Sequence, residues 1–346
     1  MRVKLGPAWA GKGRPPAGYL TAKTARAALD AILTDARRGT LAGMVKTGAT
    51  FQDAAAEWLR YIETDRKRRP STVTDYANAN RRLVAEFGSK PVEQVTAAMI
   101  DGFREELTAE LSDRTVNKYL VQLHGIFRRA QRVYGLPSNP AALVDRQPLK
   151  RSGEFNVLSP AEVEALARAA KNEQDAALFR VAAYTGLRLG ELRALRWDDV
   201  AFDKHLLHVR RSFTRGQVGA PKSGRVRSVP LLDAAAKALD GFSRREMFTD
   251  ADDLVFPNPV GAPFDDARLR LRFLVALAKA GLKRMRFHDL RHTFGTIAVQ
   301  AFPLTDVKVF MGHADISTTM IYVHHAPLRR HRHLPLGRRL PVECTQ

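Results

Sequence analysis

Apolar residues recur at helical spacing through the first half of the chain. Between residues 50 and 134 they fall into four groups, and neighbours within a group are mostly three or four positions apart. This spacing puts the apolar side chains of each group on one face of a helix, so it predicts four helices packed as one small bundle. The positions are Phe51, Ala55, Trp58, Leu59 and Ile62; Tyr76, Leu83 and Phe87; Ile100, Phe103 and Leu107; and Val116, Leu120, Leu123, Ile126 and Phe127.

The second half of the chain combines helical periodicity with two segments that alternate as strands do. Residues 159–162 read Ser-Pro-Ala-Glu, a capping box that starts a helix, and a second helix runs over 176–185. The alternating segments, 206–213 and 225–231, predict a small antiparallel sheet. The fold class is therefore mainly α with a small antiparallel β-sheet. Helical periodicity returns over residues 233–245, 265–280, 289–299, 305–310 and 317–323.

A segment rich in proline and glycine separates the two halves and predicts an extended linker between two domains. Before the helical bundle, residues 21–38 predict one further helix within a basic segment that is too short to be a domain. The predicted division is 1–46 for the basic N-terminal segment, 47–136 for the helical domain, 137–153 for the linker, 154–326 for the second domain and 327–346 for a basic C-terminal tail.

The charge of the chain narrows the choice of partner. Its 346 residues carry 56 Lys and Arg against 36 Asp and Glu, a formal charge of +20. A polyanion such as nucleic acid best accounts for this excess, and an ordinary basic enzyme is the alternative. Basic side chains gather in one connection and on the last helix of the bundle, and we expect them to face DNA rather than only solvent. They are Arg66, Lys67, Arg68, Arg69, Lys118, Arg128, Arg129 and Arg132.

Cysteine content and hydropathy exclude several classes of protein. Cys344 is the single cysteine, so neither a disulfide framework nor a thiolate zinc site can be built. No apolar stretch approaches the roughly 20 residues of a membrane span, and residues 1–20 lack the apolar core of a signal peptide. We expect a soluble, cytoplasmic protein without a membrane partner.

Two segments place a cation near a turn. Gly186 ends one helix and Arg188 begins the next, with Glu191 three residues later on the same face, where its carboxylate can orient the guanidinium. A surface ion pair is the alternative. Lys222 lies in the turn between the two predicted strands, where it can insert into a groove or stay solvated.

Two later segments add imidazoles and a phenol. On a helix, His288 and Arg291 share a face and can converge on one phosphate. His292 is four residues after His288, but the glutamate of zincin sites is missing, so we expect no metal. His313 follows a glycine, and Tyr322, nine residues later on a short helix, is either a nucleophile or a half-buried packing residue.

Taken together and in this order, the segments resemble the catalytic set of the tyrosine recombinases, the phage integrase family. The resemblance covers most of the chain. It implies a SAM-like core-binding domain over 47–136 and a mixed α/β catalytic domain over 154–326. Residues 1–46 have room only for a remnant of the arm-binding domain that integrases often carry, which puts arm-site binding in doubt.

The resemblance also implies a role for each residue of the set. Arg188 and Arg291 bind the phosphate, Lys222 is the hairpin lysine that protonates the departing 5′ oxygen, and Tyr322 is the nucleophile. His288 and His313 are the active-site histidines, with His288 our candidate for proton transfer. Glu191 orients the first arginine, and His292 is expected to be structural or to support the active-site residues without contacting the substrate.

The implied reaction is DNA cleavage and rejoining through a 3′-phosphotyrosyl linkage, by which a mobile element is integrated or excised. The covalent bond conserves the free energy of the phosphodiester, so no cofactor is expected. The expected partners are double-stranded DNA attachment sites and, on DNA, further copies of the chain in a tetramer. An accessory DNA-bending or directionality factor is a further candidate partner.

Other activities fit the same residues. A topoisomerase IB-like strand transferase would use this chemistry on one duplex, and a DNA-binding regulator would keep the fold without cutting. A metal-dependent nuclease is a more distant alternative. The attachment sequence and the preferred direction of reaction cannot be read from the chain, because base specificity depends on groove contacts.

Overall fold

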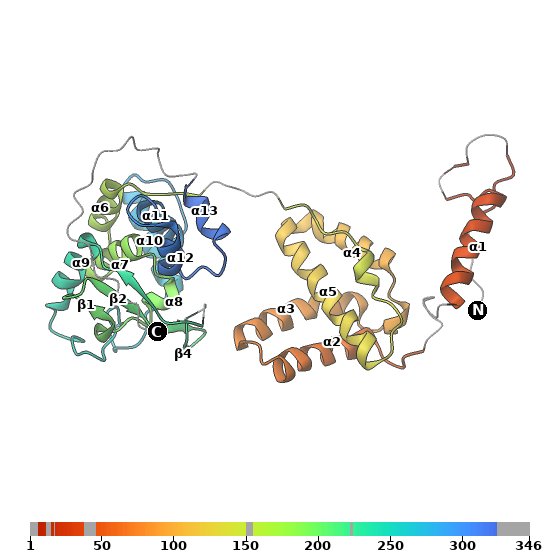
Figure 1. The fold of residues 1–346 in the computed structure, drawn as a ribbon, viewed down its shortest axis with the longest axis horizontal. Coiled ribbons are helices and arrows are strands. Elements are labelled where there is room, and N and C mark those ends of the chain that lie inside the picture. Colours follow the sequence, from red (N-terminus) through yellow and green to blue (C-terminus); the bar gives the residue numbers. More distant parts are fainter. Residues whose placement is uncertain are drawn as a thin grey trace. The chain divides into compact units, whose positions relative to one another are not determined.

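The computed structural model describes residues 6–11, 15–16, 18–37, 46–149, 155–221 and 224–323. It divides the chain into two compact units, Met1–Arg151 and Ser152–Gln346, each with a hydrophobic core of its own (Figure 1). The predicted fold class, mainly α with a small antiparallel sheet, is confirmed. The finer domain boundaries stay predictions, and the predicted tail from residue 327 lies outside the described residues.

The named elements in the described part of the first unit are all helices, and the four helices predicted between residues 50 and 134 are present. Its helices are α1 (Ala22–Arg37), α2 (Phe51–Arg60), α3 (Pro70–Phe87), α4 (Ala97–Glu110) and α5 (Asp113–Val133), with single turns η1 (Tyr61–Asp65), η2 (Val92–Gln94) and η3 (Pro140–Leu143). Thr50 begins α2 with a capping box to Asp53, and Pro70 occupies the first turn of α3.

Aromatic side chains form the centre of the first core. The ring of Phe51 lies 5.4 Å from that of Phe87 and 5.7 Å from that of Phe127. α5 crosses α2 at Gly125, where an added Cβ would lie 2.8 Å from Nε1 of Trp58. The close packing of these two helices therefore depends on a residue without a side chain.

The described part of the predicted linker is not extended. Residues 140–143 form the turn η3, and Asn139 caps it by accepting from the backbone N–H of Ala141. Asn117 on α5 accepts from the backbone N–H of Gln147 and donates to its carbonyl, both at 2.8 Å. These bonds hold the chain against the bundle as far as Gln147, so the prediction of an extended linker from residue 137 was wrong for this part.

The second unit places helices around two small antiparallel sheets. Its helices are α6 (Pro160–Arg168), α7 (Glu173–Thr185), α8 (Leu189–Leu192), η4 (Trp197–Asp199), α9 (Asp233–Ser243), α10 (Asp266–Lys279), α11 (Asp289–Ala298), α12 (Leu304–Met311) and α13 (Ser317–Val323). Its strands are β1 (Val200–Ala201), β2 (Leu206–Val209), β3 (Ser212–Thr214), β4 (Gln217–Gly219) and β5 (Arg227–Pro230). The capping box predicted at Ser159 begins α6.

The predicted strand over 206–213 is two strands that belong to different sheets. β2 lies between β1 and β5, whereas β3 pairs only with β4 in a separate hairpin. The chain leaves the first sheet at Arg210 and Arg211, which form ion pairs of 3.1 to 3.3 Å with Asp198 and Asp199. These ion pairs fix the point where β2 ends and the chain turns toward β3. The alternation of apolar and polar residues in the sequence does not show this break.

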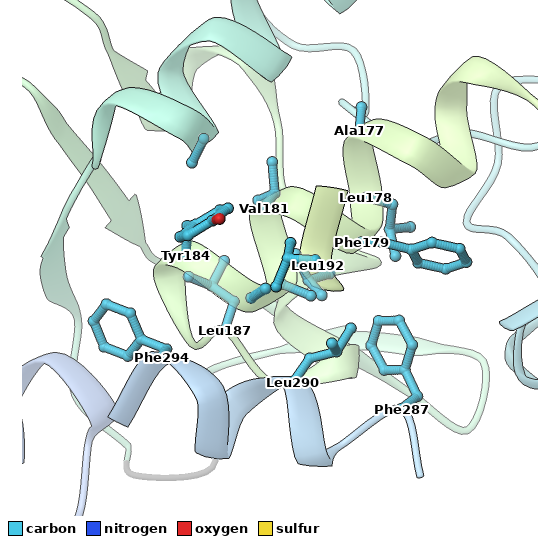
Figure 2. Packing of buried hydrophobic residues seen from close by; sticks show 14 of the residues in the cluster. Ala177, Leu178, Phe179, Val181, Tyr184, Leu187, Leu192, Phe287, Leu290 and Phe294 are labelled. Carbon is cyan, nitrogen blue, oxygen red and sulfur yellow. The ribbon is translucent and has the colours of Figure 1, made fainter. Parts of the chain in front are cut away.

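The core of the second unit is built around α7, which packs against α6, α9 and α11. Because α7 is apolar on nearly all sides, it is buried nearly throughout. Figure 2 shows Leu290 and Phe294, from α11, directed toward the side chains of Leu187 and Leu192. This packing fixes the beginning of α11 relative to the chain that follows α7, and these two segments carry His288, Arg291 and Arg188.

Replacing Gly125 by alanine should lower the free energy of unfolding of the first unit by about 1–3 kcal/mol, because the new methyl group collides with the buried ring of Trp58. The matched control is Gly102→Ala on α4, where an added Cβ meets nothing within 4 Å. The control should instead gain up to about 1 kcal/mol from helix propensity. Hydrogen exchange of the α5 and α4 amides in the full chain measures both, and equal effects of the two changes would contradict the packing argument.

Candidate active site

Five of the six predicted catalytic side chains come together in the second unit, where α7 and α12 end and α8 and α11 begin. Hydrogen bonds and ring contacts link the set across these elements and α13. The sixth residue, Lys222, lies outside the described residues. The five are Arg188, His288, Arg291, His313 and Tyr322.

Arg188 lies at the N-cap of α8 and is held from two sides. Its backbone N–H donates to Glu191 Oε2 at 2.8 Å, and its Nη1 donates to Oε1 of the same carboxylate at 3.1 Å. Nη2 donates to the carbonyl of Gly312 at 3.0 Å. These bonds fix the guanidinium beside the loop that carries His313, while 22% of the side chain stays exposed.

Arg227, on β5, completes this network and was not predicted from the sequence. Its Nη1 and Nη2 donate to the two oxygens of Glu191 at 2.9 and 2.7 Å, and its Nε donates to the carbonyl of Phe310 at 2.8 Å. Burial acts to raise the pKa of the Glu191 carboxyl, but the bonds from Arg227 and the charge of Arg188 outweigh it and lower that pKa. The sequence does contain a sign of its position: side chains alternate along a strand, so Arg227 lies on the same inward face of β5 as Val229.

Arg291 is the most deeply buried arginine of the site, with 3% of the residue exposed. Its Nη1 donates to the carbonyl of Gly186 and its Nη2 to that of Met311. Gly186 and Gly312 end α7 and α12 in the left-handed conformation, so the two carbonyls belong to helix C-termini, which carry partial negative charge. Burial, followed by the charge of Arg188, lowers the pKa of Arg291 to about 9, so it remains charged at neutral pH.

The two histidines of the set are neutral at pH 7. His288 is the N-cap of α11 and is an exposed residue, yet desolvation by the surrounding protein and the charge of Arg291 lower its pKa to about 4. His313 follows the end of α12, and its Nδ1 lies 3.0 Å from Oγ1 of Thr319. Desolvation and the charge of Arg291 lower the pKa of His313 to about 3.

Tyr322 lies on α13 and is 1% exposed. Its ring packs on the backbone of Gly295, where an added Cβ would lie 2.6 Å from the phenol ring. Its hydroxyl lies 3.0 Å from Nδ1 of His292. Burial raises the pKa of Tyr322 to about 12, although the charges of Arg291 and Arg188 act to lower it.

His292 has a more direct position than the sequence analysis gave it. Within the described residues it is His292, and not His288, that the structure brings within hydrogen-bonding distance of the phenol. The His288 ring lies 5.8 Å from the His292 ring in an edge-to-face arrangement. The expected role of His288 in proton transfer therefore has no direct contact with Tyr322 in this arrangement.

Family models match both units of the chain. The model described as "Phage integrase family" matches residues 156–329, about half of the chain, and that described as "Phage integrase, N-terminal SAM-like domain" matches residues 55–132. The chain belongs to the phage integrase family. It is an enzyme of the tyrosine recombinase class, a site-specific DNA strand transferase.

Curated relatives of this phage integrase family member carry the name tyrosine recombinase XerC. One from Xanthomonas campestris pv. campestris is 28% identical over 306 residues, which cover 84% of this chain and 90% of the relative. Another, from Xanthomonas axonopodis pv. citri, is 30% identical over 246 residues and covers 69% of this chain and 74% of the relative.

Solved structures share the fold of this recombinase. The Tn1549 transposon integrase, in complex with a circular intermediate DNA, superposes with a TM-score of 0.66 at 22% identity and covers 79% of this chain and 94% of that one. A lambda integrase dimer bound to a COC′ core site gives a TM-score of 0.67 at 16% identity, with 84% and 100% covered. Both similarities concern the fold.

The basic residues predicted to face DNA have different surroundings in the first unit of the recombinase. Arg129 is engaged within the bundle: its Nη2 donates to Glu57 at 2.7 Å, and its guanidinium lies 4.4 Å from the ring centroid of Tyr61. Its predicted DNA contact competes with this ion pair. The other seven are exposed, and DNA contact by them stays a prediction: Arg66, Lys67, Arg68, Arg69, Lys118, Arg128 and Arg132.

Neither a metal cluster nor a membrane-spanning helix is found in the described part of the recombinase. There, no three His, Cys, Asp or Glu side chains are grouped so that they could hold a metal ion. The helices described there are too short or too polar to cross a bilayer.

Arg227→Met should destabilise the second unit by about 3 kcal/mol, because it leaves the buried Glu191 carboxylate with one arginine partner in place of two. The double variant Glu191→Leu with Arg227→Met removes both buried charges and should recover part of this loss. Hydrogen exchange of the β5 amides measures the effect in the full chain. A single-variant loss below about 1 kcal/mol would show that Glu191 does not need the second arginine.

The neutral histidines should make the recombinase less stable as the pH falls. The folded state keeps His288 and His313 unprotonated down to about pH 4 and 3, whereas the unfolded chain binds protons below about pH 6.5. Stability therefore rises with pH through this window and is lost on acidification. His313→Asn should make the loss between about pH 6.5 and 5 shallower in urea titrations. The same slope in both proteins would contradict the neutral assignment of His313.

Proposed function

We propose that this recombinase cleaves and rejoins DNA through a 3′-phosphotyrosyl intermediate and thereby integrates or excises a mobile element. One observation carries the proposal: Tyr322 lies in a site whose described members include two anchored arginines and two neutral histidines, in the order that the family uses. Arg188 and Arg291 are the groups that would hold the nonbridging oxygens of the scissile phosphate, where negative charge develops during attack.

The reaction forms a bond between the Tyr322 oxygen and phosphorus and breaks the bond from phosphorus to the 5′ oxygen. The phenol proton leaves to a base in the site, and the departing oxygen takes a proton that the resemblance assigns to Lys222. His313 is suited to donate a further hydrogen bond to the phosphate. Because Tyr322 is 1% exposed, the scissile phosphate must gain access to its hydroxyl when DNA binds.

A folded N-terminal element supports integration rather than a function like that of the XerC relatives. The backbone N–H of Trp9 donates to the carbonyl of Leu20, and that of Leu20 to the carbonyl of Pro7. The ring of Trp9 meets that of Tyr19 edge to face at 6.1 Å. These contacts and α1 precede the family match, and we propose that they are the remnant of an arm-binding element.

Assembly on DNA belongs to the same proposal. A lambda integrase tetramer bound to a Holliday junction has the same fold at 16% identity and a TM-score of 0.65. Strand exchange between two duplexes needs four cleavages, so we propose that four copies of this chain act together on paired attachment sites. A topoisomerase IB-like activity would need only one duplex, and a regulator would leave DNA uncut.

A nicked suicide substrate that carries candidate sites from the flanking genome tests the chemistry. Wild type should form a covalent protein–DNA adduct in the presence of EDTA, and Tyr322→Phe should form none while it still binds DNA. Tyr184→Phe, on α7 of the same unit, is the matched control and should keep the adduct. Uncut DNA with wild type would favour the regulator, loss of cutting in EDTA a nuclease, and plasmid relaxation without paired sites a topoisomerase.

A further inference from the structure

The hydroxyl of Tyr322 has a hydrogen-bond partner that the proposed mechanism has not yet used. Nδ1 of His292 lies 3.0 Å from that oxygen. The Nδ1 of His313 is instead 3.0 Å from the hydroxyl of Thr319, and the His313 ring lies parallel to the Tyr322 ring at 6.4 Å. Among the described residues, His292 is therefore the one whose side chain meets the phenol hydroxyl.

The surroundings of His292 hold its imidazole in this position. Phe155 stacks on the ring, with centroids 4.6 Å apart and planes inclined by 27°, and meets the Tyr322 ring edge-on at 5.5 Å. Gly295, one turn further along α11, leaves the space that the phenol ring occupies. A histidine and a glycine three positions apart on one helix face thus hold the tyrosine and meet its hydroxyl.

We propose that His292 is the general base that accepts the proton of the Tyr322 hydroxyl as its oxygen attacks the scissile phosphorus. This inference rests on the proposed function. The step requires the His292 tautomer whose Nδ1 carries no proton: the proton moves from the phenol oxygen to Nδ1, the oxygen–phosphorus bond forms, and the bond to the 5′ oxygen breaks, with that oxygen taking the proton assigned to Lys222. His292 becomes an imidazolium and returns the proton when a 5′ hydroxyl reverses the step.

The charges around His292 suit this role. Among the described residues, titratable neighbours of His292 include His288 on the same helix, His313 after α12 and Tyr322 on α13, and the charges of Arg291 and Arg188 also act on these groups. Both neighbouring histidines are neutral, because their pKa values are lowered to about 4 and 3. A phenol with a pKa of about 12 needs a base at neutral pH, and His292 is the imidazole in contact with its oxygen.

The first test is the rate of adduct formation on the suicide substrate. His292→Gln keeps a hydrogen-bonding side chain but cannot accept the proton, so the rate should fall about 10²–10⁴-fold with unchanged DNA affinity. His208→Gln, on β2 and outside the site, is the matched control and should retain the wild-type rate. An unchanged or faster rate in His292→Gln overturns the proposal, because it means that His292 only restrains the resting tyrosine.

The second test separates a base from a structural support. Free imidazole should restore adduct formation in His292→Ala in proportion to its concentration. A substrate with sulfur at the bridging 5′ position has a leaving group that needs no proton, so it should leave His292→Gln slow. Full recovery on that substrate, or no response to imidazole in a folded His292→Ala, counts against the base. An adduct with wild type in the same assay keeps the proposed function intact whichever way His292 behaves.

Discussion

A positive charge buried where three helix ends meet is the constraint on which the site depends. A guanidinium removed from water is tolerated only when its donors are satisfied. Arg291 satisfies them with the carbonyls of Gly186 and Met311, at the ends of α7 and α12. Both helices must therefore stop at the same point beside α11. The packing of the second core therefore also determines where Arg291 lies. Arg188, which donates to the carbonyl of Gly312, places the start of α8 beside the same helix end.

Burial and arginine charge together set the protonation of the whole site. They hold His288 and His313 neutral, whereas burial keeps the Tyr322 phenol protonated against the same charges. The buried carboxylate of Glu191 stays ionised because two arginines hold it. The site thus offers fixed cations to an anionic substrate and places the imidazole of His292 within hydrogen-bonding distance of the phenol.

The helices could be predicted because they depend on local spacing, whereas the set of site residues was predicted from the family resemblance. Apolar periodicity located every long helix, and helix caps located Arg188 and Glu191. Sequence could not locate what depends on distant partners. The strand break at Arg210 needs the acidic turn before β1, and Arg227 matters through a carboxylate 36 positions away. Likewise, only the fold shows that α13 brings its tyrosine to His292 rather than to His288.

The contact between the Tyr322 ring and the backbone of Gly295 has a consequence for how chains of this family lose activity. A single methyl group at Gly295 would occupy the volume of the Tyr322 ring. Tyr322 is itself part of the hydrophobic core of the second unit, whereas the exposed basic residues belong to the first unit, which has a core of its own. A one-codon change at Gly295 therefore displaces the nucleophile and leaves the basic surface of the first unit in place. A related chain that binds DNA without cleaving it is thus one mutation away, and a residue other than glycine at position 295 would identify such a chain.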